Sequence, residues 1–135
     1  MRATTFKLGR LVGKLAAGAL FAGAAYISLG GSAEAKADKF GALAFSDSTG
    51  KYGWAADRAS REEAEDAAIG FCEVKDCRPI VWFKNSCGAI ARGDDRVVYY
   101  AYGQTSREES ERVAIDRCQE HTTKCVGIAW GCTSR

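Results

Sequence analysis

The sequence predicts an α+β domain that is made of two copies of one β-hairpin–helix–strand unit and is stabilised by three disulfides. Three observations carry this prediction: an internal repeat, a matched pair of helix-capping motifs, and six cysteines arranged alike in the two halves. Ser60-Arg61-Glu62-Glu63 recurs as Ser106-Arg107-Glu108-Glu109, and Cys72 recurs as Cys118 at the same offset. Two units are too few for an open solenoid, so we expect a closed, pseudo-symmetric domain.

Residues 1–35 have the pattern of a secretory signal peptide. A basic start is followed by a charge-free apolar stretch, residues 15–33, and then by Ala33-Glu34-Ala35, which places small residues where a signal peptidase reads them. We expect the mature chain to begin at Lys36, or alternatively at Asp38. An uncleaved anchor is the other interpretation, because the apolar stretch is nearly long enough to span a bilayer. No later stretch has this property, so we expect no stable membrane insertion after cleavage.

The positive charge of the chain belongs to this leader. The whole chain carries 19 Lys and Arg against 17 Asp and Glu, and four of the bases but only one of the acids lie in residues 1–35. The remainder has 15 bases and 16 acids, a net charge of −1, and the two signs alternate along it. A surface of this kind lacks the basic patch that nucleic-acid binding depends on. We therefore expect no nucleic-acid partner.

Residues 36–135 have the length of a single small domain, within which we place repeat units 40–86 and 87–132. In the first unit the alternating segment 41–46, the turn residues 47–50 and the aromatic-rich segment 51–56 predict a β-hairpin. A helix follows, because Ser60 and Glu63 form a capping box. A closing strand, residues 78–84, ends the unit. The helix residues expected to be buried recur at helical spacing: Ala64, Ala67, Ala68, Phe71 and Cys72.

The second unit repeats this order. Strand 88–92, the turn Gly93-Asp94-Asp95 and strand 97–102 form the hairpin, Ser106 and Glu109 cap the helix, and strand 126–131 closes the unit. Val113, Ala114 and Cys118 continue the buried helix stripe, while Arg117 takes the position of Phe71. The two copies differ in length only at turns, where insertions are tolerated. We expect a mostly antiparallel six-stranded sheet with both helices packed on it.

The repeat also predicts the disulfide pattern. Six cysteines allow 15 pairings, but equivalent positions in equivalent units should form equivalent bonds. Cys72–Cys77 and Cys118–Cys125 each flank a helix-to-strand turn, which leaves Cys87–Cys132 to join the two units. No Cys-x-x-Cys occurs and His121 is the only histidine, so we expect no metal and no cofactor.

Several segments resemble a known family of exported bacterial proteins. The resemblance rests on segments 41–46, 81–91 and 129–132 together with Tyr52-Gly53-Trp54, and above all on the run from Val81-Trp82 to Cys87-Gly88-Ala89. These segments are similar to the family catalogued as domain of unknown function 4189. The resemblance covers nearly all of the mature chain and implies a small exported protein. It brings no catalytic residue and no general enzymatic activity with it.

Acidic residues offer one possible chemistry. Asp94-Asp95 is the best carboxylate pair, and Asp47 lies in the matching turn of the first unit. Paired carboxylates serve glycoside hydrolysis, although Asp is also an ordinary turn residue, which is the interpretation we prefer. We interpret His121 as a solvated residue at a helix end, since no nucleophile or orienting acid can be assigned to it. A small hydrolase acting on envelope glycans is therefore an alternative hypothesis, and we assign no catalytic residue.

Aromatic residues carry the leading functional hypothesis. Tyr100 and Tyr102 lie on one face of strand 97–102, and the gap-free alignment from the helix caps matches Trp54 with Tyr100. One face of a sheet meets the helices. Ordinary core and edge packing is the commoner explanation for such aromatics, but if the domain binds a partner we expect these three rings on the other face as its contact surface. The sequence thus favours a non-enzymatic binding or interaction protein in the periplasm or outside the cell. Its partner would be a protein or a glycan, and a structural envelope component is the third hypothesis.

Overall fold

The structure is a computed structural model, and residues 34–135 are described. The predicted signal peptide, residues 1–35, lies outside the described residues apart from Glu34 and Ala35. Neither helix in the described part of the chain has the length and hydropathy needed to span a bilayer.

The elements follow one another in the order that the repeat predicts, which confirms the α+β fold class. The first unit holds β1 (Phe40–Phe45), β2 (Tyr52–Arg58), α1 (Arg61–Cys72) and β3 (Arg78–Lys84). The second holds β4 (Cys87–Arg92), β5 (Val98–Gln104), α2 (Arg107–Gln119) and β6 (Val126–Cys132).

Both capping boxes form as the sequence predicts. The Ser60 hydroxyl accepts a hydrogen bond from the backbone N–H of Glu63 at 3.1 Å, and Ser106 does the same for Glu109 at 3.2 Å. Each glutamate in turn accepts a hydrogen bond from the backbone N–H of the residue before the cap. These bonds satisfy backbone donors that the first helical turn leaves without partners.

The six strands form two antiparallel sheets of three, in the orders β2-β1-β3 and β5-β4-β6, instead of the single six-stranded sheet that we expected. Each unit completes its own sheet, because the first strand pairs with its hairpin partner on one side and with the closing strand on the other. The central strands β1 and β4 therefore have a hydrogen-bonded neighbour along each edge, and nearly all their residues are buried.

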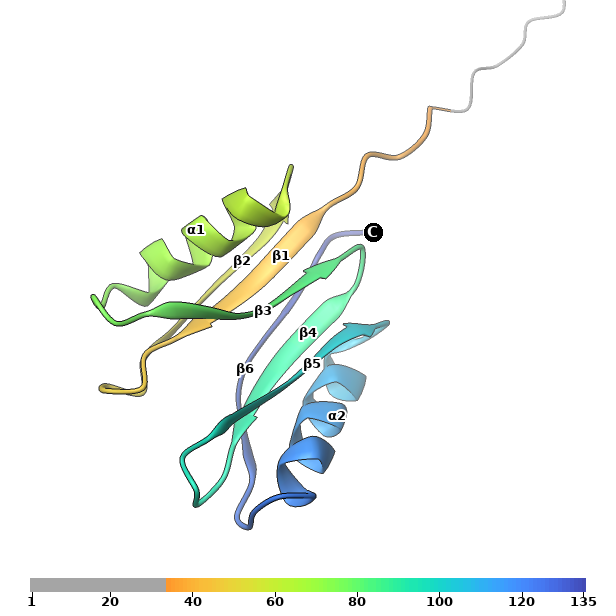
Figure 1. Cartoon of the computed structure of the whole chain (residues 1–135). Coiled ribbons are helices and arrows are strands. Elements are labelled where there is room, and N and C mark those ends of the chain that lie inside the picture. The colour runs from red at the N-terminus through yellow and green to blue at the C-terminus, as the bar shows by residue number, and fades with distance from the viewer. Residues whose placement is uncertain (1–33) are drawn as a thin grey trace, which may run out of the picture. The chain divides into compact units, whose positions relative to one another are not determined.

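The two sheets pack face to face, and each carries its helix on the outer face (Figure 1). The layer between the sheets contains the larger apolar side chains, whereas the layers under the helices consist mainly of alanine. This division follows the alternation of side chains along the strands. The layer between the sheets is formed by Leu43, Phe45, Val81, Phe83, Ile90 and Ala129.

Phe83 lies where the two repeats meet. Its side chain is 1% exposed, and three glycines border its ring: Gly41 in β1, Gly88 in β4 and Gly131 in β6. A Cβ atom at Gly88 would lie 2.5 Å from Cδ1 of Phe83, and one at Gly41 would also overlap the ring. Gly131 occupies the position in β6 that Phe83 occupies in β3. One large ring therefore fills the space between the sheets, and its repeat counterpart is a glycine.

The prediction that Phe71 is buried is wrong, because its side chain is 61% exposed. The helix meets the sheet through Ala64, Ala68 and Cys72. At Gly53 of β2 a Cβ atom would overlap the backbone of Ala68 and Cys72, so the helix lies too close to the strand for a large side chain to fit between them.

The three disulfides join Cys72 to Cys77, Cys118 to Cys125 and Cys87 to Cys132, as the repeat predicts. The first two close the turn between helix and closing strand in each unit. The third joins β4 to β6 within the second sheet, where Cys87 and Cys132 are paired across the ladder. The expectation that this bond would join the two units is therefore wrong, although the pairing itself is the predicted one. It closes a loop of 45 residues, against 5 for Cys72–Cys77.

We predict that removing Cys87–Cys132 destabilises the protein more than removing Cys72–Cys77. In the chain-entropy model a loop of 45 residues contributes about 4 kcal/mol and one of 5 residues about 2 kcal/mol. The measurement is the free energy of unfolding in denaturant for the double variants Cys87→Ala/Cys132→Ala and Cys72→Ala/Cys77→Ala, which leave no unpaired thiol. Equal losses would contradict this ordering.

Candidate functional site

Exposed aromatic side chains gather where the lateral edges of the two sheets meet. In the packed sheets β2 contacts β6 along one edge and β3 contacts β5 along the other. Each of these four strands is an edge strand of its own sheet, so its outward side chains are only partly covered. A hollow lies at each edge.

The β2/β6 groove has a volume of about 190 Å³ and is lined by side chains from both sheets. Trp54 pairs with Leu43 and therefore points from β2 toward the opposite sheet, with its Cε3 atom 3.7 Å from where a Cβ of Gly131 would lie. Its side chain is still 51% exposed. The residues of this groove are Tyr52, Trp54, Ile128, Ala129 and Trp130.

The β3/β5 groove has a volume of about 280 Å³ and the same construction. Tyr100 pairs with Ile90 and so points from β5 toward the opposite sheet, and Tyr102 lies beside it with ring centroids 6.4 Å apart. The two tyrosines are 42% and 55% exposed. The residues of this groove are Arg61, Ile80, Val81, Trp82, Tyr100 and Tyr102.

Repeat symmetry relates the two grooves. Trp82 pairs with Ala42 in one sheet and Trp130 pairs with Ala89 in the other, so the two tryptophans are equivalent and lie on the helix side of their edge strands. The guanidinium carbon of Arg61 lies 5.0 Å from the ring of Trp82, and that of Arg107 lies 4.2 Å from the ring of Trp130. A cation over an aromatic ring is attracted by the ring quadrupole. Each groove thus ends at a tryptophan held by the first arginine of a helix.

The expected binding residues lie on the expected face but in separate places. Trp54, Tyr100 and Tyr102 all lie on the sheet face away from the helices, where the opposite sheet covers the centre and leaves the edges open. Trp54 belongs to one groove and the two tyrosines to the other. Sequence reasoning missed Trp82 and Trp130 as groove residues, although the repeat aligns them at the same offset as the neighbouring cysteines.

The three carboxylates of the hydrolase hypothesis all have structural partners. Asp47 accepts bonds from Arg78, and Asp94 is 3.1 Å from the Lys124 ammonium. Asp95 accepts hydrogen bonds from the Val97 backbone N–H at 3.0 Å and from the Tyr99 hydroxyl at 2.6 Å. Glycoside hydrolysis needs a protonated carboxylic acid beside a carboxylate, whereas these partners are the ones that a turn carboxylate uses to stabilise its loop.

The single histidine, His121, lies next to Tyr99, the hydrogen-bond partner of Asp95. His121 lies just beyond α2, is exposed, and stacks on Tyr99 with ring centroids 5.4 Å apart and an interplanar angle of 10°. The bond to Asp95 raises the pKa of the Tyr99 hydroxyl above its ordinary value of 10.0, because the carboxylate favours the protonated phenol.

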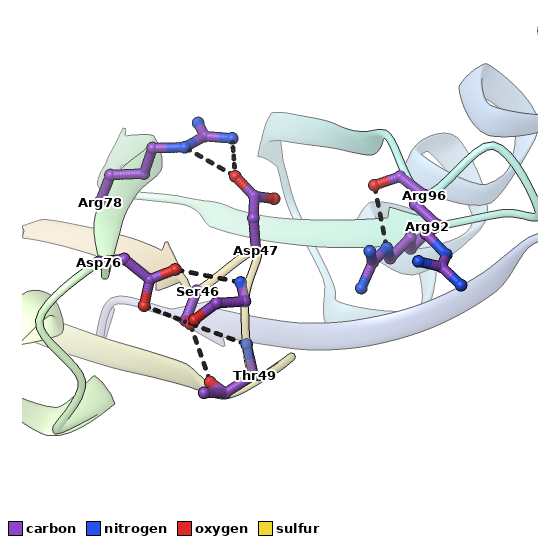
Figure 2. A network of polar contacts seen from close by, with 8 residues as sticks. Ser46, Asp47, Thr49, Asp76, Arg78, Arg92 and Arg96 are labelled. Atoms are coloured by element: carbon purple, nitrogen blue, oxygen red, sulfur yellow. Dashed lines mark hydrogen bonds and ion pairs between the residues drawn. The ribbon is translucent and has the colours of Figure 1, made fainter.

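A polar network fixes the β1–β2 turn (Figure 2). The buried Ser46 hydroxyl donates to Asp76 at 2.7 Å and accepts from the Thr49 hydroxyl at 2.8 Å. Asp76 also accepts from the Ser48 backbone N–H at 3.0 Å, so one carboxylate ties this turn to the segment after α1. The Ser46 and Ser48 bonds lower the pKa of Asp76 below its ordinary value of 3.8.

Together the fold and its surfaces define a class of protein: a two-repeat α+β domain stapled by three disulfides, as is typical of proteins from oxidising compartments outside the cytoplasm. Among residues 34–135 no group of His, Cys, Asp and Glu side chains could hold a metal ion. The candidate site on this domain is the pair of exposed aromatic grooves.

The chain belongs to the family described as Domain of unknown function (DUF4189), whose model matches residues 40–132. This confirms the resemblance that the sequence motifs indicated. The NMR structure of Rv1813c from Mycobacterium tuberculosis shares the fold, with a TM-score of 0.52 and 24% sequence identity over 92% of this chain and 99% of that chain. No curated protein matches the chain in sequence.

We predict that the contribution of Asp76 to stability depends on pH. Because its pKa is lower in the folded protein than its ordinary 3.8, the charged form stabilises the fold above that value, and this stabilisation is lost as the pH falls through the folded pKa. Asp76→Asn should therefore unfold at lower denaturant than the wild type at about pH 6, with the difference vanishing at about pH 2. Hydrogen bonds from Lys84 and from the Ser134 backbone also lower the pKa of Asp38 and Asp57. Both groups are present in both proteins, so the comparison isolates Asp76. A difference that stays constant with pH would contradict the account.

Proposed function

We propose that this protein is an exported binding protein that acts in the periplasm or outside the cell and holds a protein or glycan partner in its two aromatic grooves. The observation that carries the proposal is the repetition of the grooves. Each edge of the sandwich presents, at equivalent positions, one ring pointing from one sheet and a tryptophan from the other: Trp54 with Trp130, and Tyr100 with Trp82.

Exposed rings of this size cost free energy in water, and that cost supports a binding role. Burying apolar surface stabilises a protein by roughly 25 cal/mol per Å². The folded domain would therefore be more stable if these rings were covered, and a binding role accounts for their exposure. Tyr and Trp combine an apolar body with a polar group, which suits them to partly wet contacts with protein segments or sugar rings. The arginines over Trp82 and Trp130 restrain the two tryptophan rings before any partner binds.

The arrangement of the grooves supports a partner with repeated features. The grooves lie at opposite edges of the sandwich, because the sheet orders place β2 and β3 on either side of β1. Two related contacts on one rigid, disulfide-stapled domain allow both to engage a repetitive polymer or two copies of a partner, which raises the overall affinity through avidity. The leader sequence and the three disulfides support export.

We predict that Trp54→Ala, Tyr100→Ala and Tyr102→Ala weaken partner binding with little effect on the free energy of unfolding. Their side chains are about half exposed, and truncating an exposed contact costs about 1 to 2 kcal/mol of binding free energy or more at a hot spot. The measurements are thermal unfolding, cosedimentation with insoluble peptidoglycan for a glycan partner, and retention of envelope proteins on the immobilised domain for a protein partner.

Two controls make this comparison decisive. Val126→Ala removes an exposed apolar side chain from β6 outside the residues of the grooves and should change neither stability nor binding. Phe83→Ala truncates a buried ring and should cost about 3 to 5 kcal/mol of stability. If the three groove variants unfold as early as Phe83→Ala, the rings belong to the core and the proposed binding surface is wrong. Retention that is unchanged in all three would also refute it.

A further inference from the structure

A polar hollow lies between the two hairpin turns and shares no residue with the two aromatic grooves. Its volume is about 550 Å³, and its lining comes from residues 47–50 of the β1–β2 turn and from residues 92–94 and Arg96 of the β4–β5 turn. One turn belongs to each repeat. The Ser46 and Asp76 network described above holds the first turn in place as one wall of the hollow (Figure 2).

The charges around this hollow leave two cations without a counterion. Asp47 and Asp94 face it, but each carboxylate is paired, with Arg78 at 2.9 Å and with Lys124 at 3.1 Å respectively. Arg92 and Arg96 also line the hollow, and within residues 34–135 neither forms an ion pair with a carboxylate. Two like charges on one short turn repel each other, and a bound anion would relieve that repulsion.

Arg92 is held in position to act as a donor. Its Nε atom donates to the Arg96 carbonyl at 3.0 Å, and its guanidinium carbon lies 5.4 Å from the ring centroid of Phe45. An arginine has five N–H donors, so the four on its terminal nitrogens stay available. A guanidinium fixed in this way loses less conformational entropy when it binds a carboxylate or phosphate oxygen.

Arg96 occupies a backbone position at which the other repeat has glycine. Its φ is 62°, in the left-handed region that non-glycine residues enter at a cost. The matching turn of the first repeat has Gly50 there, with a φ of 74°. The second repeat therefore carries an arginine side chain at the edge of the hollow where glycine would be easier to accommodate. Figure 2 shows the side chains of Arg92 and Arg96 next to each other.

We propose that the hollow between the hairpin turns binds an oxyanion of the size of phosphate, held by the guanidinium groups of Arg92 and Arg96. Arginine forks match the oxygens of phosphate and give charge-assisted hydrogen bonds, which are stronger than neutral ones. A free phosphate and the phosphate of a lipid headgroup share this chemistry.

The test is a titration of the oxidised protein with inorganic phosphate. Binding is monitored by the NMR chemical shifts of the backbone and of the arginine side chains, at an ionic strength that sodium chloride keeps constant. The proposal predicts saturable shifts confined to residues 47–50 and 92–98. Arg96→Gly should weaken phosphate binding about tenfold while keeping or raising the melting temperature, because glycine suits that backbone position. Arg112→Gln, which removes one charge from α2, should bind phosphate as the wild type does.

The outcomes of the titration distinguish a phosphate-binding site from a turn in which Arg96 has only a structural role. Phosphate shifts that spread over the surface without saturation, or equal phosphate affinity in Arg96→Gly and Arg112→Gln, would overturn the proposal. A lower melting temperature in Arg96→Gly with unchanged phosphate affinity would assign Arg96 a purely structural role and would also overturn it.

A second arm identifies the source of the phosphate. The same proteins are sedimented with vesicles of phosphatidylcholine alone and with vesicles that also contain phosphatidylglycerol. Sedimentation that requires phosphatidylglycerol and Arg96 supports the site with a lipid headgroup as its ligand. Saturable phosphate binding without such sedimentation supports it with a free phosphate or phosphate monoester as the ligand.

Discussion

The packing of Phe83 against Gly41, Gly88 and Gly131 fixes how the two repeats meet. All three glycines lie on the central or closing strands, and a methyl group at Gly41 or Gly88 would overlap the ring. The repeat could not place a phenylalanine at both equivalent positions, since a second ring would need the space that Gly131 leaves free. The two repeats differ in sequence at this position because the layer between the sheets has room for only one such ring.

The rest of the architecture depends on this contact. With the sheets in close contact at their centres, the larger residues Leu43, Phe45 and Ile90 fill the layer around the ring, and the helices lie on alanine at the outer faces. The sheets twist, as antiparallel sheets do, and their edge strands are less covered than their centres. The exposed rings of β2, β3, β5 and β6 lie along those edges, so the aromatic grooves result from the same packing that forms the core.

Much of this fold could be predicted from the sequence because an element predicted in one repeat could be checked against the equivalent residues of the other. The capping boxes of Ser60 and Ser106, the element order and the disulfide pairing all rest on matched positions. The division into two sheets could not be predicted, because strand periodicity does not state which strands are neighbours. The burial of Phe71 was predicted wrongly for a related reason, because helical spacing cannot show that the helix lies too close to Gly53 of the strand for a ring to fit between them. The second repeat did carry a signal, since the residue equivalent to Phe71 is Arg117, which is suited to solvent.

The candidate sites were predicted only in part. Alternation along the strand gave the correct face for Tyr100 and Tyr102, but the contribution of Trp82 and Trp130 depends on the opposite sheet and so on long-range packing. The hollow between the turns has no sequence signal of its own, since Asp47 and Arg92 belong to different repeats and meet only when the sheets dock. The left-handed backbone of Arg96 could not be predicted either, because the glycine of this turn is Gly93 and not residue 96.

The central claim is that the Phe83 ring and the glycines around it act as one packing unit, and a double-mutant cycle tests it most directly. The free energy of unfolding is measured in denaturant for the wild type, Gly88→Ala, Phe83→Ala and the double variant. The account predicts that Gly88→Ala is destabilising when Phe83 is present and much less so when the ring is gone, with a coupling of about 1 to 3 kcal/mol. Additive effects of the two substitutions would contradict it.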